Sequence, residues 1–469
     1  MTACKGQAAP TGSPVASSAH SSVVAAQNSY ADVVSHVAPA VVTIRSERRV
    51  RAAEQFPFFE DPFFRDFFGD RFRNAQPRNQ ERLQRGLGSG VIVSADGYIL
   101  TNHHVIDGAE ELKVELNDNR SFAAKVLGSD PPSDLAVLKI ETKGLPVLPL
   151  GDSDRVRVGD IVLAVGNPLG VGQTVTMGII SAKGRQTGLS DGSFEDFLQT
   201  DAPINQGNSG GALVNTNGEL IGINSQILSP SGGNIGLGFA IPANMAKSAM
   251  DQLLKSGRVR RGMIGVTIQP VTSDLASSLG LSEVRGALVS SVQAGSPAER
   301  AGIRRGDVII GFNGSPVTDS NSLRNQVART QPGTEVMLTI SRDNREQQVR
   351  VTLGELPAER MTAATDSSGG GGSAPGKLGI RVEPLTPTLA DRLNLRGGVQ
   401  GLVVTDVDPV GPAADAGIRE NDVIEEVNRQ QVRSVEDLQS AIQRSGTKPS
   451  LLLINRGGNS LFLTVRPRQ

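Results

Sequence analysis

The stretch "GSGVIVSADGYILTNHHVI", residues 88–106, has the pattern of two short β-strands joined by a tight turn. Apolar residues alternate with small or polar residues on both sides of Asp96 and Gly97, and an Asp-Gly pair favours a hairpin turn because both residues tolerate a positive φ. Two histidines, His103 and His104, stand at the end of the second strand. The stretch therefore predicts a β-hairpin that ends in a pair of imidazole side chains.

The same strand pattern continues from about residue 30 to residue 250. Short apolar runs bounded by Gly, Asn and Asp recur as "DLAVLKI", "VGDIVLAVGNP", "TVTMGIISA", "GALVNTNGELIGINSQI" and "GLGFAIP". Many short strands with regular turns are typical of an antiparallel sandwich or barrel. The segment "ANMAKSAMDQLLKSG", residues 243–257, has helical spacing and a terminal glycine, so we expect a helix that closes this domain.

An internal repeat follows the large β domain. The segment "GALVSSVQAGSPAERAGIRRGDVIIGFNGSPV" (286–317) returns as "GLVVTDVDPVGPAADAGIRENDVIEEVNRQQV" (401–432), with 14 of 32 positions identical. Between the copies lies "TAATDSSGGGGSAPG", which has the composition of a flexible tether. A chain of 469 residues is too long for one core, so we expect one large β domain followed by two copies of a small domain.

Composition excludes several classes of protein. The 48 acidic and 47 basic residues nearly cancel, which leaves no electrostatic footprint for nucleic acid or anionic lipid. No apolar run reaches the roughly 20 residues needed to cross a bilayer. The single cysteine, Cys4, rules out an internal disulfide, and residues 1–27 are small and polar, as in a disordered tether. "MTAC" resembles the end of a lipoprotein signal, so a lipid-anchored Cys4 and a free thiol are both open.

The segment "NQGNSGGAL", residues 205–213, is the motif with the strongest chemical content. Glycines on both sides of Ser209 permit a tight turn that exposes the hydroxyl and lets successive backbone N–H groups converge on one point, as a developing oxyanion requires. An ordinary glycine turn is the alternative interpretation. A serine hydroxyl becomes nucleophilic when a base takes its proton, and histidine is the usual base.

The chain has few candidates for that base, namely His20, His36, His103 and His104. The first lies in the N-terminal tether and the second in the lead-in to the first strand, which leaves the pair at the end of the hairpin. The base needs a carboxylate to fix its tautomer, and "SDLAVLKI" places Asp134 directly before an apolar strand. A lone acid there is more often a solvated turn residue. The order His, Asp, Ser within one β-rich domain favours a catalytic role for all three.

These three segments resemble the catalytic segments of the HtrA/Deg family of serine proteases. That resemblance implies a mainly β fold, with a chymotrypsin-like double six-stranded β-barrel followed by two PDZ domains. In the family's "TN-x-HV" segment the histidine before the valine is catalytic, which selects His104 over His103. The resemblance then implies Ser209 as nucleophile, His104 as general base and acid, and Asp134 as orienting carboxylate.

The same resemblance implies an oxyanion hole formed by the backbone N–H groups of Gly207 and Ser209. Between them stands Asn208, where digestive proteases carry an aspartate that pairs with a newly cleaved N-terminus. Activation by such an ion pair is therefore excluded. We expect loops to switch the site instead.

The family's substrate-pocket segment matches "GINSQI". The resemblance implies that Ile223, Asn224 and Ser225 form the strand that pairs with substrate and shapes a small apolar pocket, which favours cleavage after Val, Ala or Ile. An ordinary barrel strand fits the same residues, and such a strand can have both roles.

PDZ domains bind C-terminal or extended peptides beside a loop whose backbone N–H groups capture a carboxylate. In the first repeat "RRGMIGVTI" matches this loop, with Ile264, Gly265 and Val266 at its centre and Arg261 supplying charge nearby. In the second repeat "KLGIRV", residues 377–382, is the counterpart. We expect the first repeat to bind peptide and the second to serve assembly more than binding, while glycines that act only in turns are the alternative.

The segment "FPFFEDPFFRDFFGDRF", residues 56–72, holds eight of the chain's 14 phenylalanines. A core element is disfavoured because the segment has neither strand nor helix period and Pro57 and Pro62 interrupt it. A membrane-binding face is open, although the basic excess typical of such faces is missing. The family resemblance implies a regulatory loop, residues 56–85, that reaches into a neighbouring subunit, and exposed phenylalanines favour such a partner surface.

The resemblance also implies domain boundaries, with a protease domain at 28–257, PDZ domains at 262–356 and 377–467, and a linker at 357–376. It implies an ATP-independent serine endopeptidase that degrades unfolded or damaged polypeptides in the bacterial periplasm, without metal or organic cofactor. We expect PDZ domains that bind C-terminal peptides, a homotrimer or larger homo-oligomer, and membrane attachment only through a lipidated Cys4. A chaperone-like holdase or PDZ scaffold with minor proteolysis is the alternative.

Overall fold

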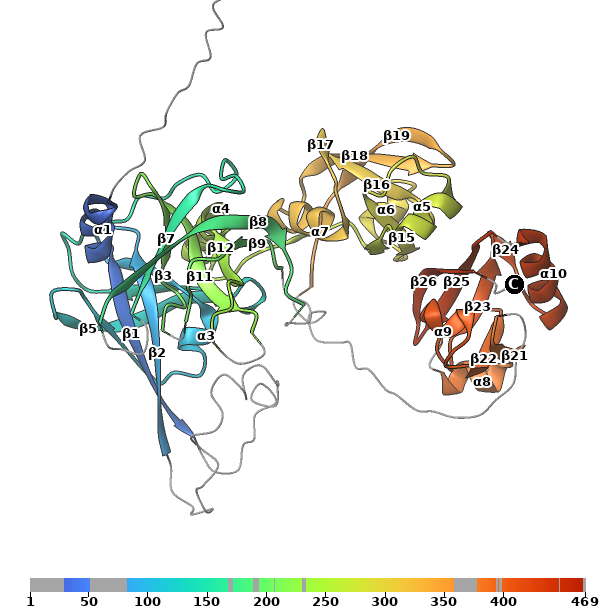
Figure 1. Ribbon diagram of the computed structural model, residues 1–469, viewed down its shortest axis with the longest axis horizontal. Coiled ribbons are helices and arrows are strands. Elements are labelled where there is room, and N and C mark those ends of the chain that lie inside the picture. Colours follow the sequence, from blue (N-terminus) through green and yellow to red (C-terminus); the bar gives the residue numbers. More distant parts are fainter. Residues whose placement is uncertain are drawn as a thin grey trace, which may run out of the picture.

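The computed structural model describes residues 29–50, 82–167, 172–188, 194–205, 207–229, 233–357, 378–393, 395, 399–446 and 448–466. Two closed β-barrels come first along the chain, and two smaller sheet domains follow (Figure 1). The predicted tether (1–27), nearly all of the predicted linker and residues 56–81 of the Phe-rich segment lie outside the described residues. Residues 82–85, expected in the Phe-rich loop, belong to a strand instead.

The predicted hairpin builds one side of the first barrel. Its strands pair antiparallel with Val91 opposite Leu100, and Gly97 takes φ +95° in the turn between them. A short helix that holds the two histidines follows the second strand directly. The barrel closes in the strand order β1-β2-β3-β6-β5-β4, preceded by α1 (Ala31–Val37) and η1 (Ala38–Ala40). Its elements are β1 (Val41–Val50), β2 (Arg82–Ile92), β3 (Tyr98–Thr101), α3 (His103–Ile106), β4 (Glu111–Glu115), β5 (Ser121–Asp130), η4 (Pro131–Ser133) and β6 (Leu135–Ile140).

The second barrel also has six strands, in the order β10-β11-β12-β9-β8-β7. The predicted helix is α4 (Ala243–Ser256), and Gly257 ends it in the left-handed conformation. One core cluster joins side chains of both barrels and of α4, so the two barrels pack as one domain. The strands are β7 (Ile161–Gly166), β8 (Thr174–Arg185), β9 (Phe197–Thr200), β10 (Ala212–Asn215), β11 (Leu220–Ile227) and β12 (Gly238–Pro242).

The two sequence repeats fold with the same topology. In each, six strands form an antiparallel sheet, and an equivalent buried aspartate pairs with an arginine at 2.7 Å, Asp307 with Arg342 and Asp422 with Arg456. The first repeat contains β13 (Gly262–Met263), β14 (Val266–Pro270), α5 (Ser273–Leu279), β15 (Ala287–Val292), α6 (Pro297–Arg300), β16 (Val308–Phe312), β17 (Ser315–Pro316), α7 (Ser320–Arg329), β18 (Glu335–Arg342), β19 (Arg345–Thr352) and β20 (Gly354–Glu355). The second contains β21 (Ile380–Pro384), α8 (Pro387–Arg392), β22 (Leu402–Val407), α9 (Pro412–Asp415), β23 (Val423–Val427), β24 (Gln430–Gln431), α10 (Val435–Ser445), β25 (Ser450–Arg456) and β26 (Asn459–Val465).

The first repeat contacts the barrels at two segments, one around Asp130 and one around Glu195. Arg261 forms an ion pair with Asp130, and its guanidinium lies 4.5 Å from the ring centroid of Phe194. On helix α7, Asn321 and Asn325 both donate to the backbone carbonyl of Glu195, at 3.0 and 2.8 Å. Within the described residues, no helix is both long and apolar enough to span a membrane.

Candidate active site

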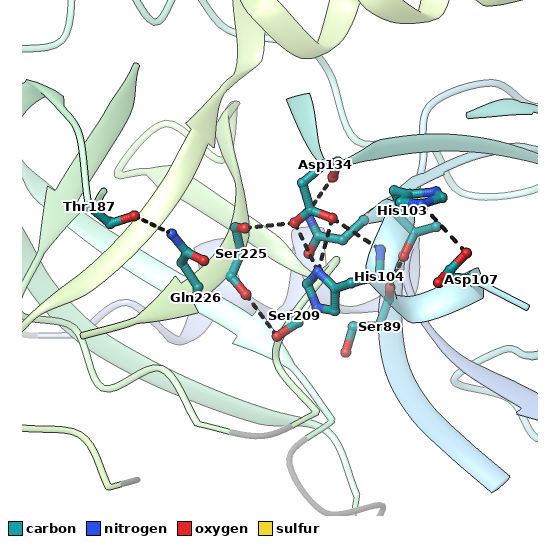
Figure 2. A network of polar contacts seen from close by, with 11 residues as sticks. Ser89, His103, His104, Asp107, Asp134, Thr187, Ser209, Ser225 and Gln226 are labelled. Carbon is teal, nitrogen blue, oxygen red and sulfur yellow. Dashed lines mark hydrogen bonds and ion pairs between the residues drawn. The ribbon is translucent and has the colours of Figure 1, made fainter. Parts of the chain in front are cut away.

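His104 and Asp134 meet because their strands are neighbours in the first barrel. Strand β3 pairs with β6, with Thr101 opposite Ala136, so the residues just beyond these strand ends lie together. The Nδ1 atom of His104 is 2.8 Å from Oδ2 of Asp134 (Figure 2). Since an ionised carboxylate only accepts hydrogen bonds, Nδ1 carries the proton and the lone pair lies on Nε2. His103 instead lies 3.6 Å from Asp107, outside this pair.

Asp134 is held by its surroundings on several sides. It has φ +53°, an uncommon conformation for a residue other than glycine. Its backbone carbonyl accepts from the Asn102 side chain at 3.0 Å and from the N–H of His103 at 3.2 Å. Its carboxylate accepts from the N–H of His104 at 3.0 Å and from the Ser225 hydroxyl at 2.9 Å. These contacts fix the carboxylate beside the imidazole.

The pair perturbs both titrations. Burial raises the pKa of the Asp134 carboxyl, but the charge of His104 and the hydrogen bonds from His104 and Ser225 outweigh it, so the pKa is lowered. Burial lowers the pKa of His104, but the charge of Asp134 and its hydrogen bond outweigh it, so the pKa is raised above the ordinary value. Both shifts favour the charged pair, which is the arrangement a general base requires after it takes a proton.

Ser209 lies in a turn of the second barrel that depends on glycine. Gly207 and Gly210 have φ +98° and +82°, and a Cβ on Gly211 would overlap the carbonyl oxygen of Val165. The Ser209 hydroxyl donates to the backbone carbonyl of Ser225 at 2.9 Å (Figure 2). Among the described contacts, none joins this hydroxyl to the imidazole. A change of the Ser209 side-chain rotamer would bring the hydroxyl from the Ser225 carbonyl toward the imidazole.

The expected pocket residues lie on strand β11 with their side chains turned into the protein. Ile223 is part of the core shared by the two barrels, and the Asn224 amide donates to the carbonyl of Ala212 at 3.0 Å. Ser225, expected to line a pocket, also joins two other site residues. Its hydroxyl contacts Asp134 and its carbonyl contacts Ser209. Contact of these three positions with substrate would therefore run through the backbone.

The expected carboxylate-binding loop of the first repeat has the backbone geometry of a tight turn. Gly265 has φ +85°, its carbonyl accepts from Gln293, and the carbonyl of Ile264 accepts from Ala298, both at 2.9 Å. In this loop Val266 begins strand β14. The second repeat has the same pattern, with Asp408 donating to Gly379 at 2.8 Å and Ala413 donating to Leu378 at 3.0 Å.

Arg261, expected to supply charge beside this loop, is committed elsewhere. Its Nη1 atom donates to Asp130 at 2.8 Å, and both side chains are buried. Arg261 therefore does not supply charge beside the loop, because it forms a contact between domains that the local sequence does not indicate.

Ser89 is a contact of the nucleophile turn that the motifs did not indicate. Its N–H donates to the carbonyl of Ser209 at 2.8 Å and its hydroxyl donates to the carbonyl of Gly207 at 2.6 Å. The available signal is a serine between two glycines, directly before the apolar run of the hairpin's first strand. No cluster of three or more His, Cys, Asp or Glu side chains suited to a metal occurs among the described residues.

Two closed six-stranded barrels with histidine, aspartate and serine at their junction define the class of chymotrypsin-like serine proteases. The family model for a trypsin-like peptidase domain matches residues 88–223, and models for PDZ domains match residues 262–353 and 403–456. A "Probable periplasmic serine endoprotease DegP-like" of Chlamydia muridarum is 44% identical over 411 residues, which cover 88% of this chain and 80% of the relative. A protein of the same description from Hahella chejuensis is 43% identical over 445 residues, 93% of each chain.

A solved structure of a protease is also similar to this chain. The HtrA-type protease AlgW with a decapeptide is 48% identical, with a TM-score of 0.55, and the match covers 70% of this chain and 99% of that one. The chain belongs to the HtrA/Deg family of periplasmic serine endoproteases. It is a serine endoprotease with two PDZ domains, and like these relatives it is periplasmic.

Proposed function

We propose that Ser209 is the nucleophile, His104 the general base and acid, and Asp134 the carboxylate that orients the base. The observation that carries the proposal is the 2.8 Å contact between Asp134 and Nδ1 of His104, which leaves Nε2 free to accept a proton. Ser225 supports it, because one residue contacts both the carboxylate and the nucleophile.

The reaction begins when the Ser209 hydroxyl rotates from the Ser225 carbonyl to Nε2 of His104. Nε2 takes the proton as Oγ attacks the carbonyl carbon of the scissile peptide bond, and the backbone N–H groups of Gly207 and Ser209 stabilise the oxyanion that forms. His104 then gives its proton to the leaving amine, which breaks the C–N bond and leaves an acyl-enzyme. Water, deprotonated by His104, hydrolyses the ester and restores Ser209.

The substrates under this proposal are unfolded or damaged polypeptides, cleaved after small apolar residues. Strand β11, with Ile223, Asn224 and Ser225, pairs with the substrate backbone. The loop of Ile264, Gly265 and Val266 receives C-terminal peptides, in line with the peptide bound to the related HtrA-type protease. The second repeat serves assembly. The working unit is a homotrimer, a state that sedimentation mass tests directly.

The same proposal divides the chain into functional parts. Residues 28–257 form the protease domain, 262–356 and 377–467 the two PDZ domains, and 357–376 the linker between them. Residues 56–81 regulate the site from a neighbouring subunit, and a lipid on Cys4 would attach the enzyme to a membrane.

The Ser209→Ala variant tests the proposed nucleophile. We expect it to lose at least about 1,000-fold in the rate of casein degradation, because neither acyl-enzyme nor oxyanion can form. Continued degradation of casein by this variant would show the assignment to be wrong. If the variant is inactive but still prevents aggregation of an unfolded client, the chain has a holdase activity beside proteolysis.

A further inference from the structure

We propose that Ser89 is a positioning residue for catalysis, whose hydroxyl holds the turn of Gly207 to Ser209 in the geometry that the oxyanion donors require. Ser89 lies in strand β2 of the first barrel, 118 residues from Gly207 in sequence, and is fully buried. The inference rests on the proposed function, because it concerns the same nucleophile and the same oxyanion hole.

Every polar group of Ser89 is used. Its N–H donates to the carbonyl of Ser209 at 2.8 Å, and its carbonyl accepts from the Thr101 hydroxyl at 2.7 Å. Its own hydroxyl donates to the carbonyl of Gly207 at 2.6 Å and accepts from the N–H of Asn167 at 3.0 Å. One side-chain oxygen thus joins strand β2, the end of strand β7 and the nucleophile turn.

The positions of these contacts along the turn explain their effect. The Gly207 carbonyl belongs to the peptide unit between Gly207 and Asn208, and the Ser209 carbonyl belongs to the unit that follows Ser209. The N–H of Ser209, one proposed oxyanion donor, belongs to the unit between them. Because both flanking units are held by Ser89, and the carbonyl of the central unit accepts from the N–H of Gly211 at 2.9 Å, the central unit has little freedom to rotate. The other proposed donor is the N–H of Gly207, and the carbonyl of this same residue accepts the hydrogen bond from Ser89.

Glycine makes this restraint important, beside the hydrogen bond at 3.0 Å from the N–H of Asn208 to the carbonyl of Asn205 in the same peptide unit. Gly207 has φ +98°, and a residue without a Cβ has few steric barriers to a rotation of its peptide units. A buried carbonyl that loses its donor is unfavourable, so removal of the Ser89 hydroxyl favours rotation of the Gly207 carbonyl toward another partner. Such a rotation would change the backbone torsions that join this peptide unit to its two neighbours, which carry the donors, and so would displace the donors from the oxyanion position.

The backbone of Ser89 packs closely on the turn, but its hydroxyl can be removed by substitution without disturbing that packing. A Cβ on Gly210 would overlap the carbonyl oxygen of Ser89 and the hydroxyl of Thr101, so the turn packs directly on the strand. Ser89→Ala removes one oxygen and keeps this packing and the N–H contact to Ser209. Ser89→Cys keeps a side chain of similar size but offers a weaker donor.

The experiment measures kcat and KM on a chromogenic peptide with the full-length enzyme. We expect Ser89→Ala to lower kcat about 10- to 100-fold, which is less than the loss of an oxyanion donor itself, with KM changed less than about twofold. Ser89→Cys should give an intermediate kcat. The matched control is Ser153→Ala, which removes another buried hydroxyl, the one that accepts from the N–H of Asn244 at 3.1 Å, and should leave kcat unchanged.

Two further readouts separate positioning from a general structural effect. The inhibition constant of a peptide boronic acid, which forms a tetrahedral adduct, should rise in proportion to the loss of kcat/KM in Ser89→Ala. The dissociation constant of the uncleaved peptide, measured in a Ser209→Ala background, should be the same with and without Ser89→Ala. The acid limb of the pH profile should also stay in place, because His104 is untouched.

The outcomes are distinguishable from failure of the proposed function. If Ser209→Ala stays active, the triad assignment fails whatever Ser89→Ala does. If Ser209→Ala is inactive while Ser89→Ala keeps kcat within about twofold of wild type, only the positioning role is overturned. A Ser89→Cys enzyme with wild-type kcat beside an impaired Ser89→Ala enzyme would also overturn it, because side-chain volume and not the hydrogen bond would then matter.

Discussion

Asp134 acts on His104 through both its charge and its hydrogen bonds, and this has a measurable consequence for the pH at which the base works. Burial alone would keep the imidazole neutral. The raised pKa of His104 shows that the carboxylate overcomes burial. In the proposed mechanism the neutral form of His104 accepts the serine proton, and this form becomes dominant only above the raised pKa.

We therefore expect kcat/KM to fall as pH decreases through a value above the ordinary histidine pKa of 6.5. In Asp134→Asn, burial acts without the opposing charge, so the pKa of His104 falls and the acid limb moves to lower pH. The same variant should lose about 10⁴-fold in kcat because the tautomer is no longer fixed. Hydrolysis of a peptide substrate between pH 5 and 9 gives both quantities, and an acid limb that stays in place would contradict the assignment.

At this scale the sequence predicts some residues far better than others. His104, Asp134 and Ser209 each stand in a motif with its own chemical meaning. The structure places His104 against Asp134, and Ser225 contacts both Asp134 and Ser209. Ser89 has no such motif, because its partners are backbone carbonyls that only the folded chain brings to it. Residues that act through backbone contacts at long sequence separation leave little trace in local pattern.

Among the elements, the hairpin β2–β3 and the turn that holds Ser209 are in closest contact at Gly210. Gly210 has φ +82°, and its Cα faces the carbonyl of Ser89 and the hydroxyl of Thr101 so closely that a side chain would overlap both. The predicted hairpin and the predicted helix at residues 243–257 are confirmed, because alternation and helical spacing are local signals. The contact between the hairpin and the turn joins the two barrels, so these local signals do not predict it.

Gly210→Ala should therefore destabilise the protease domain by at least about 2 kcal/mol, since it adds overlap with a backbone atom to the strain of a positive φ. Gly144→Ala is the control, because Gly144 has φ +71° and open space around it, and it should cost only about 1 kcal/mol. Thermal unfolding of the protease domain measures both. Equal losses in the two variants would show that the contact with Ser89 adds nothing.

The whole molecule is held together by surfaces that differ in character. The two repeats share an apolar cluster in which Leu451, Leu453 and Phe462 of the second repeat pack on the first, and Gln269 exchanges two hydrogen bonds with the backbone of Phe462, at 2.9 and 2.8 Å. The first repeat contacts the barrels through polar and charged groups. Neither surface could be predicted from the sequence, since each joins residues that are individually ordinary.

Adjacent arginines show how burial decides the strength of an ion pair, one to the barrels and one within the first repeat. Arg261 pairs with Asp130, and the two side chains are 8% and 6% exposed. Arg260 pairs with Glu355 at 2.6 Å, but these side chains are 49% and 36% exposed. A buried charge that loses its partner costs about 3–5 kcal/mol, whereas an exposed pair contributes about 0–1 kcal/mol.

Arg261→Ala should therefore weaken the contact between the first repeat and the barrels, and Arg260→Ala should leave it intact. In the first variant the hydroxyl of Ser133 is the one partner left to the Asp130 carboxylate among the described residues, so the buried carboxylate favours exposure to water. Hydrogen exchange should then speed up at residues 194–197 and 320–329, which face each other across this surface, while strands β15 and β16 inside the repeat keep their protection. Unchanged exchange at the surface in Arg261→Ala, or equal acceleration in both variants, would mean that the amides of Asn321 and Asn325 hold the two domains without help from the ion pair.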